Sequence, residues 1–354
     1  MSIDTNVPAT ATVQRPTLAE TERMRAEPGR TVLLYITDQC PVGCAHCSVD
    51  SKPDSPRVSD WPLFEQVVAG IAQLPRAESV AISGGEPFVE RKALPYAVNA
   101  FADAGKAVVV FTSGHWAPPG DRPAAAWITK VLRRISTVFL STDAFHQGMV
   151  DQERFTAAVG AVAEAGCRVV IQALDTGTGV EPARQALEKV FGPQWAEYAD
   201  LKPITPLRSG RGADVFALRQ MHAADRFSVP CTLLGSPTIR YDGVAIPCCN
   251  EPVTIGQGPD GLRRRIRGAA DVGAALGEFD RDPLLRLVST TGPAGIAALG
   301  PFRELNEGRF ENICGACWKS FDIAATDPAA GRLVNALTAL APTPTATTEA
   351  GSMS

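Results

Sequence analysis

Nine cysteines occur among the 354 residues of this chain, and three of them fall within one short segment. Residues 40–47 read CPVGCAHC, which places thiols at Cys40, Cys44 and Cys47. Three thiolates in one loop can hold an iron–sulfur cube and leave one iron without a protein ligand, so that another molecule can bind there. A zinc site would need a fourth ligand, which His46 can supply, and free thiols are the remaining alternative.

The segments around this loop alternate between short apolar runs and amphipathic helical patterns. Six runs are predicted to be strands: Thr31–Thr37, Ser79–Ser83, Ala107–Thr112, Thr137–Thr142, Arg168–Leu174 and Asp200–Ile204. Helices are predicted between them, at Trp61–Leu74, Ala93–Ala104, Ala124–Ile135, Glu153–Ala165 and Glu181–Phe191. Strands joined by helices indicate an α/β fold with a parallel sheet and right-handed crossovers.

Parallel sheets place their chemistry at the carboxyl ends of the strands, so the residues after each run are candidates for a site. Four runs are followed by polar or glycine-containing segments: Ser83–Pro87 (SGGEP), Thr112–Gly114 (TSG), Ser141–Asp143 (STD) and Pro206–Arg211 (PLRSGR). Together with the CxxxCxxC loop after the first strand, they resemble the motifs of the radical S-adenosylmethionine (SAM) enzymes. The resemblance covers about residues 30–212.

This resemblance implies a partial (β/α)6 barrel in which Cys40, Cys44 and Cys47 ligate a [4Fe–4S] cluster and SAM chelates the open iron. One electron from the reduced cluster would cleave SAM, and the resulting 5′-deoxyadenosyl radical would take hydrogen from a C–H bond. The electron would come from a donor such as flavodoxin or ferredoxin. The residues that the resemblance assigns to SAM binding are Gly84, Gly85, Glu86, Thr112, Ser141 and Arg211.

A second group of cysteines lies beyond the predicted barrel. Cys231 is followed by eleven residues, Gly243, four residues and Cys248, and Cys314 and Cys317 come later as a CxxC pair. This spacing resembles the "twitch" extension of the same family, which implies a second, auxiliary [4Fe–4S] cluster with four cysteine ligands. A four-cysteine structural zinc site is the alternative.

Two cysteines remain. Cys167 opens the fifth predicted strand and is expected to be a buried apolar filler. Cys249 adjoins Cys248, and it is either a surplus thiol, an alternative ligand in place of Cys248, or a catalytic hydrogen donor. A thiol that quenches a substrate radical from the face opposite the adenosyl group would invert the stereocentre.

Among radical SAM enzymes with a twitch extension, the chain resembles those that act on aminoglycoside antibiotics. The spare thiol favours the epimerases among them, which convert neomycin C to neomycin B by inverting a sugar carbon. A dehydrogenase of an aminocyclitol alcohol and a peptide-modifying maturase are the alternatives. Carboxylates for the ammonium groups of such a substrate, and imidazoles for its hydroxyl groups, follow the strand ends at Glu90, His115, Asp143, His146 and Asp175.

Composition narrows the class of protein further. A formal charge of −4 and a pI near 5.7 argue against nucleic acid as the main partner. Neither a signal peptide nor a membrane span is recognisable, so we expect a cytoplasmic enzyme. The predicted organisation is an N-terminal extension (1–29), the barrel (30–212), the auxiliary-cluster domain (213–335) and a disordered tail (336–354).

Overall fold

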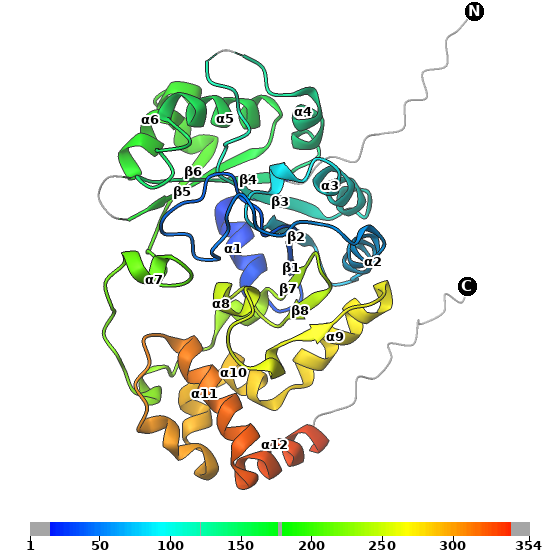
Figure 1. Ribbon diagram of the computed structural model, residues 1–354, viewed down its shortest axis with the longest axis vertical. Helices are drawn as coiled ribbons and strands as arrows, with labels where there is room; N and C mark the ends of the chain where they lie inside the picture. The colour runs from blue at the N-terminus through cyan, green and yellow to red at the C-terminus, as the bar shows by residue number, and fades with distance from the viewer. Residues whose placement is uncertain (1–14, 121, 176–178, 341–354) are drawn as a thin grey trace, which may run out of the picture. The chain divides into compact units, whose positions relative to one another are not determined.

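The computed structural model describes residues 15–120, 122–175 and 179–340 (Figure 1). Contacts within the chain divide it into two units. The first unit comprises the residues up to Arg219 together with Thr232–Leu276, and the second comprises Gln220–Cys231 together with the residues from Gly277 onward.

The first unit is built on a nine-stranded sheet with the order β6-β5-β4-β3-β2-β1-β7-β8-β9. The first six strands are parallel and lie in chain order: β1 (Thr31–Tyr35), β2 (Ser79–Ser83), β3 (Ala107–Thr112), β4 (Thr137–Thr142), β5 (Arg168–Leu174) and β6 (Ala199–Ile204). A helix lies in each connection between them: α2 (Trp61–Ala72), α3 (Ala93–Asp103), α4 (Ala126–Leu132), α5 (Gln152–Glu164) and α6 (Val180–Phe191). The predicted α/β fold with a (β/α)6 arrangement is therefore confirmed.

Local sequence explains where these helices begin and end. The Asp60 side chain accepts a hydrogen bond from the Leu63 N–H at 3.0 Å, and Pro62 occupies the first turn of α2. Gly105 and Gly166 follow α3 and α5 with φ of 73° and 81°, a left-handed conformation that ends a helix at little cost for glycine.

Helix α1 (Leu18–Ala26) begins near the amino-terminal end of β4. Leu18 packs against the buried side chains of Ala81, Val109, Phe139 and Val170, which come from β2 to β5. The segment just before α1 is tied to the beginning of β4, because the Thr137 hydroxyl donates to the Pro16 carbonyl oxygen at 3.3 Å. The loops at the carboxyl ends of the strands form the other edge of the sheet.

The remaining strands of the sheet come from a segment after the predicted barrel: β7 (Thr238–Arg240), β8 (Val244–Ile246) and β9 (Arg264–Arg265). β7 pairs in parallel with β1, with Leu33 opposite Thr238, and β8 returns antiparallel to it. This pairing places residues 232–276 in the first unit, so the division of the chain differs from the boundary predicted at residue 212. Short helices α7 (Gly212–Val215) and α8 (Glu251–Thr254) also belong to this unit, and α9 (Ala269–Arg281) begins in it.

The second unit is helical, with α10 (Pro283–Ala297), α11 (Ile313–Thr326) and α12 (Pro328–Leu340) as its main elements. A kink in α10 lies at Gly292, where φ is 69° and a Cβ would overlap the Phe227 carbonyl oxygen. Residues 336–340, expected in a disordered tail, form the end of α12, and the rest of that predicted tail lies outside the described residues. In the described part of the chain, no helix combines the length and apolar character that crossing a membrane requires.

We predict that Phe139→Ala lowers the free energy of unfolding by about 3–5 kcal/mol, because it empties the centre of the cluster beneath Leu18. Urea-induced unfolding of the full chain measures this change. Leu218→Ala is the control: this side chain is 76 % exposed, and its loss should change the value by no more than about 0.5 kcal/mol. Equal effects of the two substitutions would contradict the packing described.

Candidate functional site

The loop with the three cysteines leaves the carboxyl end of β1 and folds tightly on itself. Gly43 has a φ of 59°, and the Cys47 N–H donates to the Cys44 carbonyl oxygen at 3.2 Å. Cys44 is buried, whereas Cys40 and Cys47 are half-buried. The Ser51 N–H donates to the Cys47 sulfur at 3.3 Å. All three sequence-predicted ligands therefore lie in one compact loop.

The surroundings of Cys40 suit a metal ligand whose thiol stays protonated until a metal binds and displaces the proton. Burial raises the pKa of the Cys40 thiol to about 12, and the negative charge of Glu86 acts in the same direction. The backbone N–H groups of Val42 and Gly43 donate to its sulfur and oppose this shift. Backbone N–H groups directed at sulfur are also the donors that tune iron–sulfur clusters, so the loop fits a [4Fe–4S] cluster.

The glycine turn after β2 packs against the chain that leads into the cysteine loop. A Cβ on Gly84 would lie 2.5 Å from the Thr37 carbonyl oxygen, and a Cβ on Gly85 would overlap the Gln39 carbonyl oxygen. The Gly85 N–H donates to Thr37 at 2.7 Å, and the Glu86 N–H donates to Gln39 at 2.9 Å. The glycines are therefore required for contact within the protein, and their contact with SAM stays a prediction.

The Glu86 carboxylate is 1 % exposed and joins the ends of β2 and β3. It accepts hydrogen bonds from the Thr112 hydroxyl at 2.7 Å, from the Ser113 hydroxyl at 2.6 Å and from the Ser113 N–H at 2.9 Å. The Thr112 oxygen accepts in turn from the Trp116 indole N–H at 3.1 Å. Glu86 and Thr112, both predicted to bind SAM, thus bind each other.

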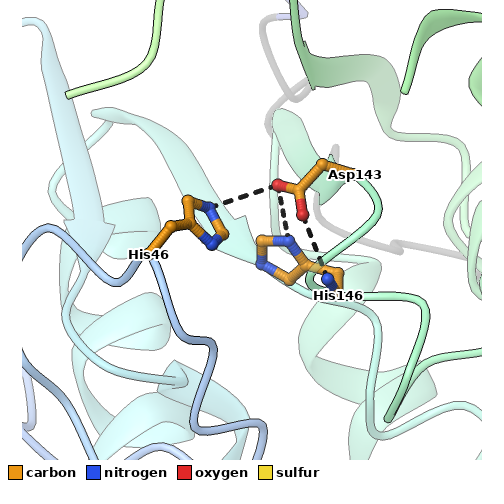
Figure 2. Close-up of side chains that lie close together, drawn as sticks. All are labelled: His46, Asp143 and His146. Atoms are coloured by element: carbon orange, nitrogen blue, oxygen red, sulfur yellow. Dashed lines mark hydrogen bonds and ion pairs between the residues drawn. The ribbon is translucent and has the colours of Figure 1, made fainter. Parts of the chain in front are cut away.

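Three polar side chains from the cysteine loop and the segment after β4 meet at the carboxyl end of the sheet (Figure 2). Asp143 Oδ2 lies 2.8 Å from His146 Nδ1 and 3.3 Å from His46 Nε2. The other carboxylate oxygen, Oδ1, accepts the backbone N–H groups of Phe145 and His146 at 2.8 and 3.0 Å. The sequence singled out Asp143 and His146 as substrate contacts but considered His46 only as a zinc ligand.

The side chains of this group shift one another's pKa values. Burial alone would raise the pKa of Asp143, but hydrogen bonds from His146 and His46 outweigh it and hold that pKa well below its ordinary value. Burial alone would lower the pKa of His146, but hydrogen bonds with Asp143 and the Cys44 sulfur outweigh it and raise that pKa to about 10. At neutral pH the pair is therefore a carboxylate and an imidazolium.

Aromatic rings surround His46. The Phe145 ring stacks on it with the centroids 4.6 Å apart, and the Phe216 ring lies edge-on at 6.0 Å. Nδ1 of His46 is buried without a hydrogen-bond partner. The donor atoms of His46, Asp143 and His146 lie within 4.8 Å of one another, and two imidazoles with one carboxylate are also a donor set for divalent transition metals.

The other predicted substrate contacts do not join this group. Glu90 is buried, with Arg57 Nη2 3.5 Å from its Oε2, and Asp175 is exposed. His115 is half-buried, and its carbonyl oxygen accepts from Arg154 at 3.1 Å. Ser141, predicted to bind SAM, is half-buried within the end of β4.

Arg211 was assigned to SAM by resemblance, but its guanidinium binds the cysteine loop. It donates to the carbonyl oxygens of Cys44 and Ser51 and forms an ion pair with Asp50. The partners are 160 residues or more apart in the sequence. A local sequence pattern cannot predict a contact between residues that are so far apart in the chain.

Cys249 lies beside the end of α1. Arg25 Nη2 is 3.6 Å from its sulfur, and the Leu233 carbonyl oxygen is 4.0 Å away. Burial raises the pKa of the Cys249 thiol, and the positive charge of Arg25 only partly opposes this. The thiol is therefore protonated at neutral pH, and the structure does not group it with the side chains at the carboxyl ends of β1 to β4.

Three of the four predicted auxiliary ligands lie in the second unit. Cys314 and Cys317 are one turn apart at the start of α11, whose first N–H groups are capped by Asn312 Oδ1 at 3.0 and 3.2 Å. Burial raises the pKa of Cys317, and the neighbouring Cys314 and Cys231 thiols raise it further, so these three groups lie close together. Cys248, the fourth, follows β8 in the first unit.

No protein-family model and no curated protein matches the chain. Several solved structures are similar to it. SuiB from Streptococcus suis bound to S-adenosylmethionine is 14 % identical, with a TM-score of 0.45 over 76 % of this chain and 69 % of SuiB. BtrN in complex with AdoMet (S-adenosylmethionine) and 2-DOIA is 12 % identical, with a TM-score of 0.43 over 75 % of this chain and 88 % of BtrN. The anSMEcpe protein with bound AdoMet and the Cp18Cys peptide is 15 % identical, with a TM-score of 0.46 over 87 % of this chain and 99 % of that one. At these identities and TM-scores the likeness assigns neither an activity nor a substrate to this chain.

Proposed function

We propose that this protein is a radical SAM enzyme. The observation that carries the proposal is the compact loop with Cys40, Cys44 and Cys47, which stands at the carboxyl end of a parallel strand with backbone N–H groups directed at its sulfurs. Three thiols of this kind suit a [4Fe–4S] cluster with one open iron. The adjacent turn, from Gly84 to Glu86, holds the entry to this loop by two backbone hydrogen bonds.

Cys40, Cys44 and Cys47 would hold a [4Fe–4S] cluster, which would supply the electron that cleaves SAM to the 5′-deoxyadenosyl radical used for hydrogen abstraction from substrate. The chain's own part is positioning. Glu86 fixes the turns after β2 and β3 to each other, and the Asp143–His146 pair presents a fixed imidazolium beside Cys44. The half-buried rings of Phe145 and Phe216 pack against His46 and shield it partly from water.

We propose a second [4Fe–4S] cluster held by Cys231, Cys248, Cys314 and Cys317. The mutual influence of three of these thiols within the second unit supports it. Turnover with two such clusters requires an external one-electron donor, for which flavodoxin or ferredoxin is the appropriate class.

The finer proposal is epimerisation of an aminoglycoside sugar carbon, as in the conversion of neomycin C to neomycin B. Hydrogen would leave one face of that carbon as a hydrogen atom, and the Cys249 S–H would return one to the opposite face. The resulting thiyl radical would need one electron and one proton, for which the proposed second cluster is the electron source. A protonated Cys249 thiol supports this proposal, because only the S–H form can donate a hydrogen atom.

Anaerobic reconstitution tests the two cysteine groups. Because each cube holds four irons, the full chain should bind about eight irons and cleave SAM in the presence of reductant. Cys47→Ala should bind about four and cleave none, whereas Cys317→Ala should bind about four and still cleave SAM. Cys167→Ala, whose buried thiol donates to the Leu132 carbonyl oxygen at 3.1 Å, is the matched control and should behave as wild type. SAM cleavage by Cys47→Ala would refute the first site, and an iron content unchanged by Cys317→Ala would refute the second.

The finer proposal depends on one side chain. Cys249→Ala should still cleave SAM but should yield no inverted product from a neomycin-type substrate, as measured by mass spectrometry and NMR. In D2O the wild-type product should carry one deuterium at the inverted carbon, because a thiol exchanges its hydrogen with solvent. Normal epimer yield from the variant would exclude Cys249 as the donor, and an oxidised, ketone-bearing product would indicate a dehydrogenase.

The Asp143–His146 pair predicts a pH dependence in the cluster-free chain. The pKa of His146 rises from 6.5 in the unfolded chain to about 10 in the folded one, so its stabilisation is complete below pH 6.5 and is lost as the pH rises through 10. The difference in free energy of unfolding between wild type and Asp143→Asn should therefore shrink over this range. Asp54→Asn, at an exposed carboxylate, is the control and should differ from wild type by a constant amount. A constant difference for Asp143→Asn would contradict the assignment.

A further inference from the structure

The first and last of the six barrel strands, β1 and β6, do not pair with each other, yet the loops that follow them are joined by hydrogen bonds. β1 and β6 are separated in the sheet by β2 to β5. Nevertheless, the Arg211 N–H donates to the Cys47 carbonyl oxygen at 3.0 Å, and the Ser209 hydroxyl donates to the Ser48 carbonyl oxygen at 2.6 Å. The turn after β6 thus binds the cysteine loop that follows β1, at the carboxyl end of the sheet.

The Arg211 guanidinium makes most of the hydrogen bonds between this turn and the cysteine loop. Nε and Nη2 donate to the Cys44 carbonyl oxygen at 3.0 and 2.7 Å, and Nη2 also donates to the Ser51 carbonyl oxygen at 2.9 Å. Nη1 pairs with the Asp50 carboxylate at 2.6 Å. That carboxylate is 46 % exposed, so the ion pair contributes little to stability. The specificity of the contact comes from the planar guanidinium, whose N–H groups donate to backbone carbonyl oxygens.

The backbone of the turn is shaped for this approach. Gly210 has a φ of 52°, and a Cβ there would lie 2.5 Å from the Cys47 carbonyl oxygen and 2.9 Å from the Asp50 nitrogen. A Cβ on Gly212 would lie 3.0 Å from the His46 carbonyl oxygen. Two glycines therefore flank Arg211 where any side chain would separate the turn from the cysteine loop.

The contacts set the direction of the peptide groups in the cysteine loop. The carbonyl oxygens of Cys44, Cys47 and Ser51 are held by Arg211, whereas the Ser51 N–H points at the Cys47 sulfur. Hydrogen bonds to cluster sulfurs and nearby charges set the reduction potential of a cluster, and the partners that orient its ligands influence its retention.

We propose that Arg211 is a positioning residue for the cluster in the cysteine loop: it orients the ligand peptides and places a fixed positive charge beside them. The inference rests on the proposed function and assigns Arg211 a role different from SAM binding. Loss of the guanidinium should loosen the ligands and remove a charge that favours the reduced state.

The test uses the reconstituted full chain and follows the EPR signal of the reduced cluster that changes when SAM is added. In Arg211→Gln, iron loss from this cluster to a chelator should be about 10-fold or more faster than in wild type. The midpoint potential of the same signal should shift to a more negative value. Arg211→Lys keeps the charge but not the fork, so it should lose iron faster than wild type while its potential stays near that of wild type.

Arg208→Gln is the matched control, because Arg208 lies in the same turn and donates to the Phe216 and Ala213 carbonyl oxygens. It should keep the wild-type rate and potential. Wild-type rate and potential in Arg211→Gln would overturn the inference. Should that variant not fold, as judged by circular dichroism, Arg211→Lys and Ser209→Ala decide, and wild-type chelation rates in both would overturn it. A wild-type chain without a SAM-responsive signal would refute the proposed function instead.

Discussion

The loop from Gln39 to Ser51 carries three thiols but little regular secondary structure, so its shape depends on hydrogen bonds from other segments. On one side, the turn at Gly84 and Gly85 approaches the chain so closely that no Cβ fits. On the other side, Arg211 holds three of the loop's carbonyl oxygens. Both supports come from the carboxyl ends of strands in the same sheet. The geometry of a site at these thiols is therefore a property of the whole sheet rather than of the CxxxCxxC segment.

The buried carboxylates at this end of the sheet are all engaged by donors within the protein. Glu86 is bound by Thr112 and Ser113, Asp143 is bound by His146, and Glu90 lies beside Arg57. An ammonium group of a substrate would have to displace these donors, at the cost of leaving them without acceptors. The polar atoms of the cysteine loop that are buried without a hydrogen-bond partner are His46 Nδ1 and Ser51 Oγ. The proposed aminoglycoside would thus contact this region through its hydroxyl groups, and its ammonium groups would need other carboxylates, such as the exposed Asp175.

Much of the barrel was predictable because apolar runs and helix-ending glycines are local signals. β2, β3, β4 and β5 have the predicted bounds, and the three-cysteine loop follows the first strand as expected. What the sequence could not show are contacts between distant segments: Arg211 with Cys44, Thr112 with Glu86, and β7 with β1. α1 was missed because its sequence, LAETERMRA, is too polar to give an amphipathic pattern. His46 carried one usable signal, its place between two cysteines, but its partners Asp143 and His146 are about a hundred residues away.

The docking of α1 has a consequence for the order in which the chain can fold. Leu18 emerges from the ribosome early, but the side chains that cover it, Ala81, Val109, Phe139 and Val170, are synthesised over the following 150 or so residues. Its apolar surface therefore has its full set of partners only once β5 exists. Native contacts of such long sequence separation form slowly, so α1 closes the sheet as a late step and not as a nucleus. The packing of this amino-terminal helix therefore depends on strands that follow it in the chain by up to about 150 residues.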